Sequence, residues 1–118
     1  MDKSADLARH ERLRSLGVIR TLFESGQSGF IYPIRFLYLK AEEDRAHNAT
    51  LFSVPKRFHR RANKRNLLRR RLKEALRLNK GLISGRGLNI ALIYSTKSEH
   101  SYKTIENAVK KILAQMAE

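Results

Sequence analysis

The sequence predicts an α/β sandwich, in which helices pack on one small sheet within a single domain of 118 residues. Residues 60–79 and the segment after about residue 98 carry apolar side chains at helical intervals, which is typical of amphipathic helices. Residues 88–94 are almost continuously apolar, as expected for a central strand buried on both faces. Residues 30–40 are rich in aromatic and β-branched side chains and predict a further strand.

The N-terminal half predicts one helix followed by two or three strands. Ser15 is placed to cap a helix that runs to Ser25, and Gly26 ends it. Residues 25–29 are expected to form a loop, and Pro33 pushes the regular part of the following strand toward its C-terminal side. A polar connection leads to a second strand at 50–55, and the two strands are expected to pair as a hairpin. Residues 1–10 are expected to be a flexible N-terminus.

The C-terminal half predicts a helix, a buried strand and a last helix. In the first helix, from about Arg60 to Asn79, one apolar stripe is formed by Leu68, Leu72, Ala75 and Leu76. A connection rich in glycine precedes the strand. The last helix is expected to begin near Ser98 or Ser101. Its inner stripe consists of Ile105, Ala108, Val109, Ile112 and Leu113.

Positive charge is concentrated between Lys56 and Lys80, where there are twelve Lys or Arg residues and one acid, Glu74. This segment supplies +11 of the formal net charge of +14. A solvated helix face normally mixes both signs, because like charges one turn apart repel each other. Arginine also offers a planar fork that suits phosphate groups. The segment therefore predicts a folded basic surface that binds a polyanion, with nucleic acid as the first choice.

Several other classes of protein are excluded or disfavoured. The chain has no cysteine, which excludes disulfides, thiolate metal sites and cysteine nucleophiles and fits the cytoplasm. No apolar run approaches the roughly 20 residues of a membrane span, and no protein partner is evident. A buried strand follows the basic helix, which disfavours a helix-turn-helix DNA-binding protein. We predict no catalytic or metal-binding side chain, because the histidines lie in unrelated segments: His10, His47, His59 and His100. A lone surface histidine is usually inert, and His59, within the basic segment, suits an RNA contact better than catalysis.

The basic segment also carries a recognisable motif. The basic pair Lys56-Arg57 follows the strand at 50–55, and Arg60-Arg61-Ala62 comes next; the helical run is Arg65-Asn66-Leu67-Leu68-Arg69-Arg70-Arg71-Leu72-Lys73-Glu74-Ala75. This pattern resembles the bacterial ribonuclease P protein subunit, and the likeness extends over about residues 10–116. Two positions depart from the family pattern. Leu67 replaces the third residue of the family's Arg-Asn-Arg motif, and Ile19 replaces an aromatic residue of the first helix.

The resemblance implies a fold of order αβββαβα, a two-layer sandwich on a small mixed sheet that contains a left-handed crossover. It also implies that the catalyst is an RNA subunit, which uses Mg²⁺, and that the protein itself needs no cofactor. The expected partners are this catalytic RNA and precursor tRNA, whose 5′ leader is removed. The expected contacts with the catalytic RNA are Lys56, Arg57, Arg60, Arg61, Lys64, Arg65, Asn66, Arg69, Arg70 and Lys73. The expected contacts with the leader are Arg12, Ile19, Phe23, Tyr38 and Ser53.

Aromatic residues near the expected leader cleft offer ring faces for unpaired bases. They are Phe23, Tyr32, Phe36 and Tyr38, although aromatic residues at these spacings more often belong to a core. A second interpretation of the whole chain remains open at this point. The same composition and fold class also suit a general RNA-binding or ribosomal-type protein without any role in a nuclease.

Overall fold

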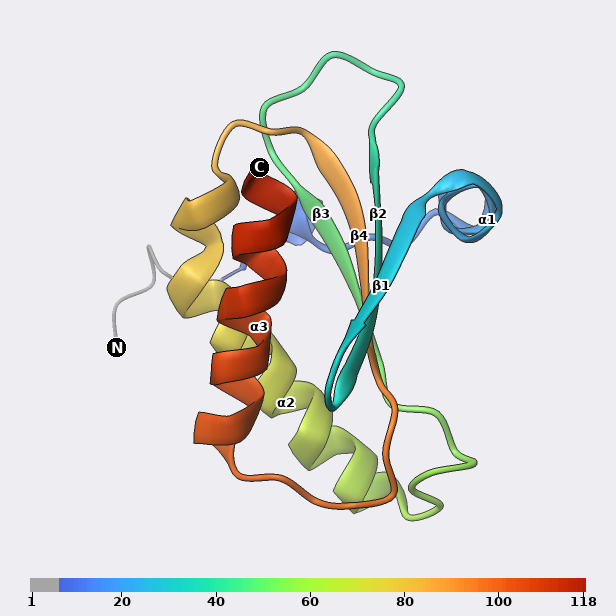
Figure 1. Ribbon diagram of the computed structural model, residues 1–118. Coiled ribbons are helices and arrows are strands. Elements are labelled where there is room, and N and C mark those ends of the chain that lie inside the picture. The colour runs from blue at the N-terminus through green and yellow to red at the C-terminus, as the bar shows by residue number, and fades with distance from the viewer. Residues whose placement is uncertain (1–6) are drawn as a thin grey trace.

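The computed structural model describes residues 7–118, in which helices pack on a four-stranded mixed sheet (Figure 1). In chain order the elements are η2 (Arg9–Glu11), α1 (Leu16–Ser25), β1 (Gln27–Ile31), β2 (Ile34–Lys40), β3 (Ala49–Ser53), α2 (Ala62–Asn79), η3 (Lys80–Ile83), β4 (Leu88–Tyr94) and α3 (Tyr102–Ala117). Apart from the two short 3-10 helices, this is the order αβββαβα that the family resemblance implied.

The strands lie in the order β1-β2-β4-β3. β2 pairs antiparallel with β1 and with β4, whereas β3 and β4 are parallel. The predicted hairpin between residues 30–40 and 50–55 is therefore wrong, because β4 lies between β2 and β3. The hairpin is instead β1–β2, with its turn at Tyr32 and Pro33. Every residue of β4 is buried, so the most apolar strand takes a position with a neighbour on each side.

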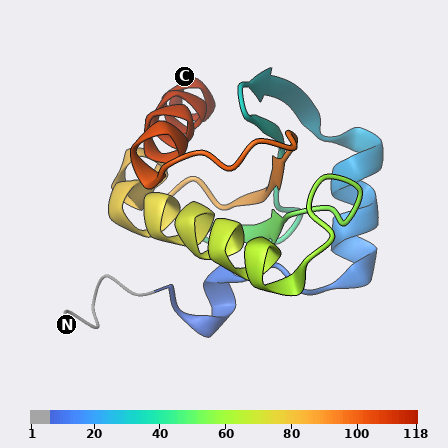
Figure 2. The ribbon, with the colours of Figure 1, turned by 90° about the horizontal axis from the view of Figure 1, so that it is seen from below.

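The connection from β3 to β4 through α2 is left-handed. In Figure 1 both strands run downward, β3 lies behind β4, and α2 returns upward on the left of the sheet; Figure 2 shows the same arrangement from below. Nearly all parallel crossovers are right-handed. The expectation from the family resemblance is confirmed.

Helices cover the two faces of the sheet unequally (Figures 1 and 2). α2 and α3 lie on one face and enclose the larger core, which includes the predicted stripes of both helices. This is the predicted two-layer sandwich. α1 crosses the opposite face and forms a smaller core around Leu22, Leu37 and Ala91. The face that α1 covers is called the α1 face below.

The edge strand β1 was not predicted, because residues 25–29 were expected to be a loop. Gly29 lies opposite Phe36 in the β1–β2 register. A Cβ atom at Gly29 would lie 2.5 Å from the Phe36 ring, so only glycine lets the ring pack here. The glycine that indicated a loop therefore serves a strand.

Side-chain caps set the starts of two helices as predicted. The hydroxyl of Ser15 accepts a hydrogen bond from the Val18 N–H at 3.3 Å, and Ser101 accepts one from the Thr104 N–H at 3.3 Å. Residues 1–6 of the predicted flexible N-terminus lie outside the described residues. Further along, the ammonium of Lys80 bonds Glu11 at 3.1 Å and ties η2 to the end of α2. Within residues 7–118, no helix is long and apolar enough to cross a membrane.

Candidate RNA interface

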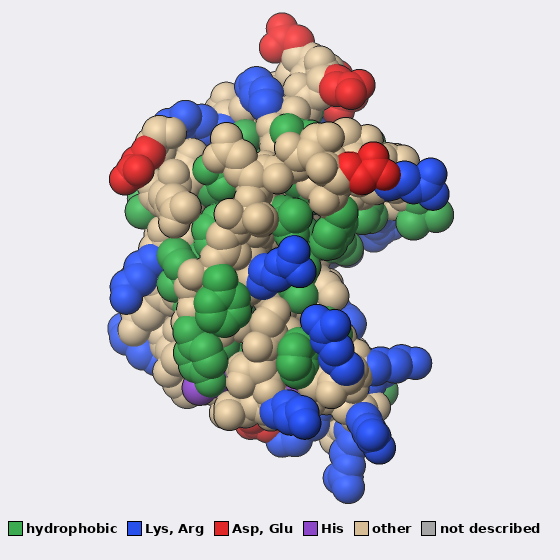
Figure 3. Space-filling view, turned by 45° about the vertical axis from the view of Figure 1, so that its right-hand side comes forward, with side chains coloured by type: hydrophobic (Ala, Val, Ile, Leu, Met, Phe, Trp, Pro, Cys, Tyr) green, Lys and Arg blue, Asp and Glu red, His purple; other side chains and the backbone are tan. Residues whose placement is uncertain are grey.

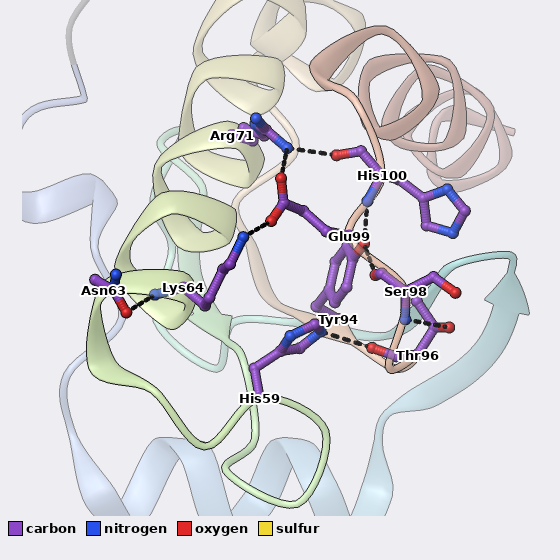
Figure 4. Close-up of polar contacts among 9 residues, drawn as sticks. All are labelled: His59, Asn63, Lys64, Arg71, Tyr94, Thr96, Ser98, Glu99 and His100. Atoms are coloured by element: carbon purple, nitrogen blue, oxygen red, sulfur yellow. Dashed lines mark hydrogen bonds and ion pairs between the residues drawn. The ribbon is translucent and has the colours of Figure 1, made fainter.

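Residues 54–61, called the basic loop, connect β3 to α2 and expose four predicted RNA contacts: Lys56, Arg57, Arg60 and Arg61. His59 anchors this loop. Its side chain is buried, and its Nε2 lies 2.8 Å from the Thr96 carbonyl oxygen, to which it donates (Figure 4). The ring faces the protein, so the structure gives His59 an anchoring role and does not place it as an RNA contact.

Arg65 shapes the same loop from the first turn of α2. Its Nη1 donates to the carbonyl oxygens of His59 at 3.1 Å and Arg60 at 2.6 Å. Arg65 lies three residues before Leu68 and seven before Leu72, in line with the apolar stripe, where an unpaired charge would be costly. These two carbonyl groups supply the partners that the guanidinium needs there. Arg65 thus positions the cations of the basic loop.

One side of α2 meets the segment that precedes α1. Arg12 forms a parallel bridge with Thr50 of β3, and the Leu13 N–H donates to the Thr50 carbonyl at 3.0 Å. Arg69 Nη1 donates to Asn66 Oδ1 at 3.1 Å on the neighbouring α2 surface. We call the cluster of Arg12, Arg14, Asn66, Arg69 and Lys73 the α2 basic flank.

The electrostatics of Lys73 show how crowded the positive charge of this flank is. Partial burial lowers the pKa of Lys73 below its ordinary value of 10.5, and the nearby charges of Arg12, Arg69 and Arg14 lower it further. The folded protein therefore disfavours the ammonium form. Phosphate groups would relieve this repulsion, which is the behaviour expected of a polyanion site. Arg12, a predicted contact with the leader, therefore lies close to Arg69 and Lys73, which are predicted contacts with the catalytic RNA.

Replacing Lys73 is expected to separate stability from binding. Lys73→Met should raise the free energy of unfolding at neutral pH slightly, by less than about 1 kcal/mol, because it removes a repelled charge. This gain should shrink as the pH rises toward 10.5, since wild-type Lys73 then loses its proton and its penalty. RNA affinity should fall. Urea denaturation and RNA titration would measure both effects, with Lys110→Met on the exposed side of α3 as the control. A loss of stability in Lys73→Met would contradict the account of a repelled lysine.

Lys64 belongs to a different side of α2. Its ammonium forms an ion pair with Glu99, whose second oxygen lies 3.8 Å from Arg71 Nη1 (Figure 4). Arg71 Nη1 also donates to the His100 carbonyl at 2.6 Å. The hydrogen bond and charge of Lys64, with a smaller effect of the Arg71 charge, hold the pKa of Glu99 below its usual value. Leu67, which replaces the third residue of the family's Arg-Asn-Arg motif, lies about one helical turn after Lys64 and one turn before Arg71. It therefore lies on the same side of α2 as these two residues.

The α1 face separates the predicted leader contacts. The half-buried Ile19 and the 44% exposed Phe23 lie one turn apart on α1, and Ser53 is half-buried on this face of β3. Tyr38, by contrast, packs against the larger core on the other face and donates its hydroxyl hydrogen to Gln27 at 2.7 Å. Phe36 is 1% exposed there. The structure therefore does not place Tyr38 or Phe36 with Phe23.

The molecular surface is hollowed on one side. In Figure 3 the right-hand side is recessed, and Lys and Arg side chains gather at the lower right below the recess. Most of the visible Asp and Glu side chains lie in the upper half of this view. Two cations were absent from the predicted contacts: Arg14, which lies near Lys73, and Arg35, which lies on the α1 face of β2. Strand alternation offered a signal for Arg35, because it lies between the buried Ile34 and Phe36.

Comparisons with known proteins agree with this geometry. The family model described as ribonuclease P matches residues 7–117. The ribonuclease P protein component of Porphyromonas gingivalis is 35% identical, and the match covers 94% of this chain and 86% of that protein. The ribonuclease P protein from Thermotoga maritima has a TM-score of 0.77 at 25% identity, covering 89% of this chain and 96% of that one. The Staphylococcus aureus protein shares the fold, with a TM-score of 0.76 at 17% identity over 92% and 95% of the two chains. Because the family model spans nearly the whole described chain and the curated relative covers most of its length, the chain belongs to the ribonuclease P protein family.

Proposed function

We infer that this chain is the protein component of ribonuclease P and supports removal of the 5′ leader from precursor tRNA. Family membership supports this function. The main structural support is the arrangement of two surfaces. The basic loop and the α2 basic flank form one of them, and they adjoin the other, a recessed sheet face with little acidic charge. A catalytic RNA and its RNA substrate repel each other, and a protein with a net charge of +14 lowers that repulsion.

We assign the two surfaces to two RNA ligands. The basic loop and the α2 basic flank bind phosphates of the catalytic RNA, with arginine forks as the main donors. The α1 face, between α1 and the basic loop, accommodates the single-stranded leader, whose unpaired bases are free to stack. Phe23 contributes the ring face in this cleft, and Ile19 contributes apolar contact where the family has an aromatic residue.

The chemistry belongs to the RNA subunit in this proposal. No group of three or more His, Cys, Asp or Glu side chains within residues 7–118 is arranged to hold a metal ion. We assign Mg²⁺ to the RNA because the family resemblance implies a catalytic RNA; bound there, the ion would supply activation of water and charge neutralisation. The side chains of this protein bind, orient and neutralise. We place the reaction in the cytoplasm, in accord with a chain without cysteine.

Reconstitution tests this function directly. The protein is mixed with a bacterial ribonuclease P RNA and a precursor tRNA, and cleavage is measured over a series of Mg²⁺ concentrations. We expect the protein to restore cleavage at low Mg²⁺, because the protein replaces part of the neutralising charge. RNA binding without restored cleavage would instead indicate a general RNA-binding or ribosomal-type protein.

The leader cleft makes a separate prediction at Phe23. Phe23→Ala should weaken holoenzyme binding of precursor tRNA by about 1–3 kcal/mol, the range for one lost base stack, and leave mature tRNA binding nearly unchanged. The salt dependence should stay the same, because Phe23 neutralises no phosphate. Equilibrium binding of both tRNA forms would measure this difference. Leu78→Ala, which removes a similarly exposed apolar side chain from the far end of α2, is the control. Equal weakening of both tRNA forms would place the leader elsewhere.

A further inference from the structure

Residues 95–101, called the β4–α3 loop, connect β4 to α3 and lie against the basic loop (Figure 4). The β4–α3 loop contains one lysine and one glutamate, Lys97 and Glu99, so it adds no net charge to the RNA surface. It contacts the basic loop through the hydrogen bond that His59 Nε2 donates to the Thr96 carbonyl oxygen at 2.8 Å. The basic loop is therefore fixed to a segment that itself has little attraction for a polyanion.

Tyr94, the last residue of β4, holds the β4–α3 loop in shape. It is 0% exposed, and its hydroxyl group donates to the Ser98 carbonyl at 2.6 Å and accepts from the His100 N–H at 3.0 Å. Burial raises the pKa of Tyr94, so the hydroxyl stays protonated and able to donate. The ring of Tyr94 also lies beside that of His59, with a centroid separation of 5.6 Å. One buried tyrosine thus contacts both the β4–α3 loop and the histidine that binds it.

Two other parts of the fold also bind the β4–α3 loop. At the β1–β2 turn, the Ser95 N–H donates to the Pro33 carbonyl at 2.9 Å, and the Tyr32 hydroxyl lies 3.0 Å from His100 Nε2. On α2, Arg71 Nη1 donates to the His100 carbonyl at 2.6 Å. The carbonyl group that accepts from the basic loop therefore belongs to a segment that is anchored at several points.

The basic loop has a different character, because nearly all of its charge faces outward. Within residues 56–61, His59 is the one buried residue, whereas the four cations are exposed. Like charges this close along a chain repel each other, which favours a looser loop. A loose loop loses conformational entropy when a ligand orders it, and that loss weakens binding. An internal anchor removes part of this loss before the RNA binds.

We propose that His59 is a positioning residue for RNA recognition. By donating to Thr96, it holds the four cations of the basic loop in the arrangement that binds phosphates of the catalytic RNA. This inference rests on the proposed function, and it adds that a buried side chain facing away from the RNA sets the affinity of the exposed ones. Arg65 supports the same arrangement from α2, through the carbonyl groups of His59 and Arg60. Charge alone therefore does not account for binding, because the loop must also be held in place.

The test replaces His59 and measures the affinity of the protein for the catalytic RNA without tRNA. His59→Phe keeps a buried ring and removes the donor to Thr96, so affinity should fall by about threefold to tenfold. His59→Gln should restore most of the affinity, because its side-chain amide donates to the same carbonyl oxygen. The salt dependence should stay the same in both variants, because every cation of the basic loop remains. Limited digestion with trypsin should cut residues 56–61 faster in His59→Phe than in the wild type.

Two further variants separate positioning from overall stability. Tyr94→Phe keeps the buried ring and loses the hydroxyl that fixes the β4–α3 loop, so it should weaken RNA binding and expose the basic loop to trypsin in the same direction. His47→Phe, at a half-buried histidine between β2 and β3, is the matched control and should change neither quantity. All titrations are made at a temperature at which circular dichroism shows each variant to be folded.

The outcomes distinguish this inference from the function on which it rests. Failure of the wild-type protein to bind the catalytic RNA would overturn the proposed function. If the wild type binds, unchanged affinity and trypsin resistance in both His59→Phe and Tyr94→Phe would overturn only the positioning role. A loss in His59→Phe that His59→Gln does not restore, with a salt dependence lower by about one ion, would overturn it in favour of a direct phosphate contact at His59.

Discussion

Leu72→Ala is expected to lower the free energy of unfolding by roughly 2–5 kcal/mol. Leu72 is 0% exposed, and it lies in the larger core between α2 and the sheet. Truncation removes apolar contacts and leaves a cavity that the surrounding strands and helices fill only in part. Urea denaturation followed by circular dichroism measures the change. The loss is a large share of the total stability expected for a domain of this size.

The matched control for Leu72→Ala lies two residues earlier on the same helix. Arg70 is exposed on the outer side of α2, so Arg70→Ala should change the free energy of unfolding by no more than about 0.5 kcal/mol. The contrast between the two variants tests which face of α2 is buried. A loss below about 0.5 kcal/mol for Leu72→Ala would mean that this face is assigned wrongly, and the α2 basic flank would be assigned wrongly with it.

The second large effect is expected on RNA binding, from the double variant Arg12→Ala with Arg69→Ala. These arginines come from segments far apart in the sequence, and both lie near Lys73. If both bind phosphates, each loss should weaken assembly with the catalytic RNA by about 1–3 kcal/mol. The salt dependence of binding should fall by about two ions. Titration of the RNA without tRNA, at several salt concentrations, measures both quantities.

The control for this double variant removes the same charge elsewhere. Lys103→Ala with Lys110→Ala takes two exposed cations from α3, away from the α2 basic flank. A similar loss of affinity in both double variants would show that RNA binding depends on total charge and not on this flank. The single variants complete a double-mutant cycle. Non-additive losses for Arg12 and Arg69 would indicate that the two side chains act on the same region of the RNA.

Local sequence patterns predicted much of the scaffold. The continuous apolar run at Leu88–Tyr94 became the fully buried β4, and the stripe through Leu68 and Leu72 became the inner face of α2. Ser15 and Ser101 cap the helices that they were expected to start. These features follow from contacts within a few residues, or from an apolar period that any core would bury. The charge between Lys56 and Lys80 likewise indicated a polyanion partner before any fold was known.

Tertiary structure alone decided which residues meet. The sequence around Lys40 and Thr50 does not show that β4 lies between β2 and β3. Strand order depends on burying the most apolar strand between two neighbours, which local sequence does not specify. For the same reason the sequence did not separate Tyr38 from Phe23, which lie on opposite sides of the sheet.

At the candidate RNA interface, too, some features followed from the sequence and others only from the tertiary structure. The sequence by itself determined the elements, the apolar faces and the sign of the surface charge. The pairing of Lys64 with Glu99, the burial of His59 against Thr96 and the meeting of Arg12 with Lys73 join segments at least 35 residues apart. Such contacts depend on how the chain returns through space, because side-chain partners are chosen by packing and desolvation and not by spacing along the sequence.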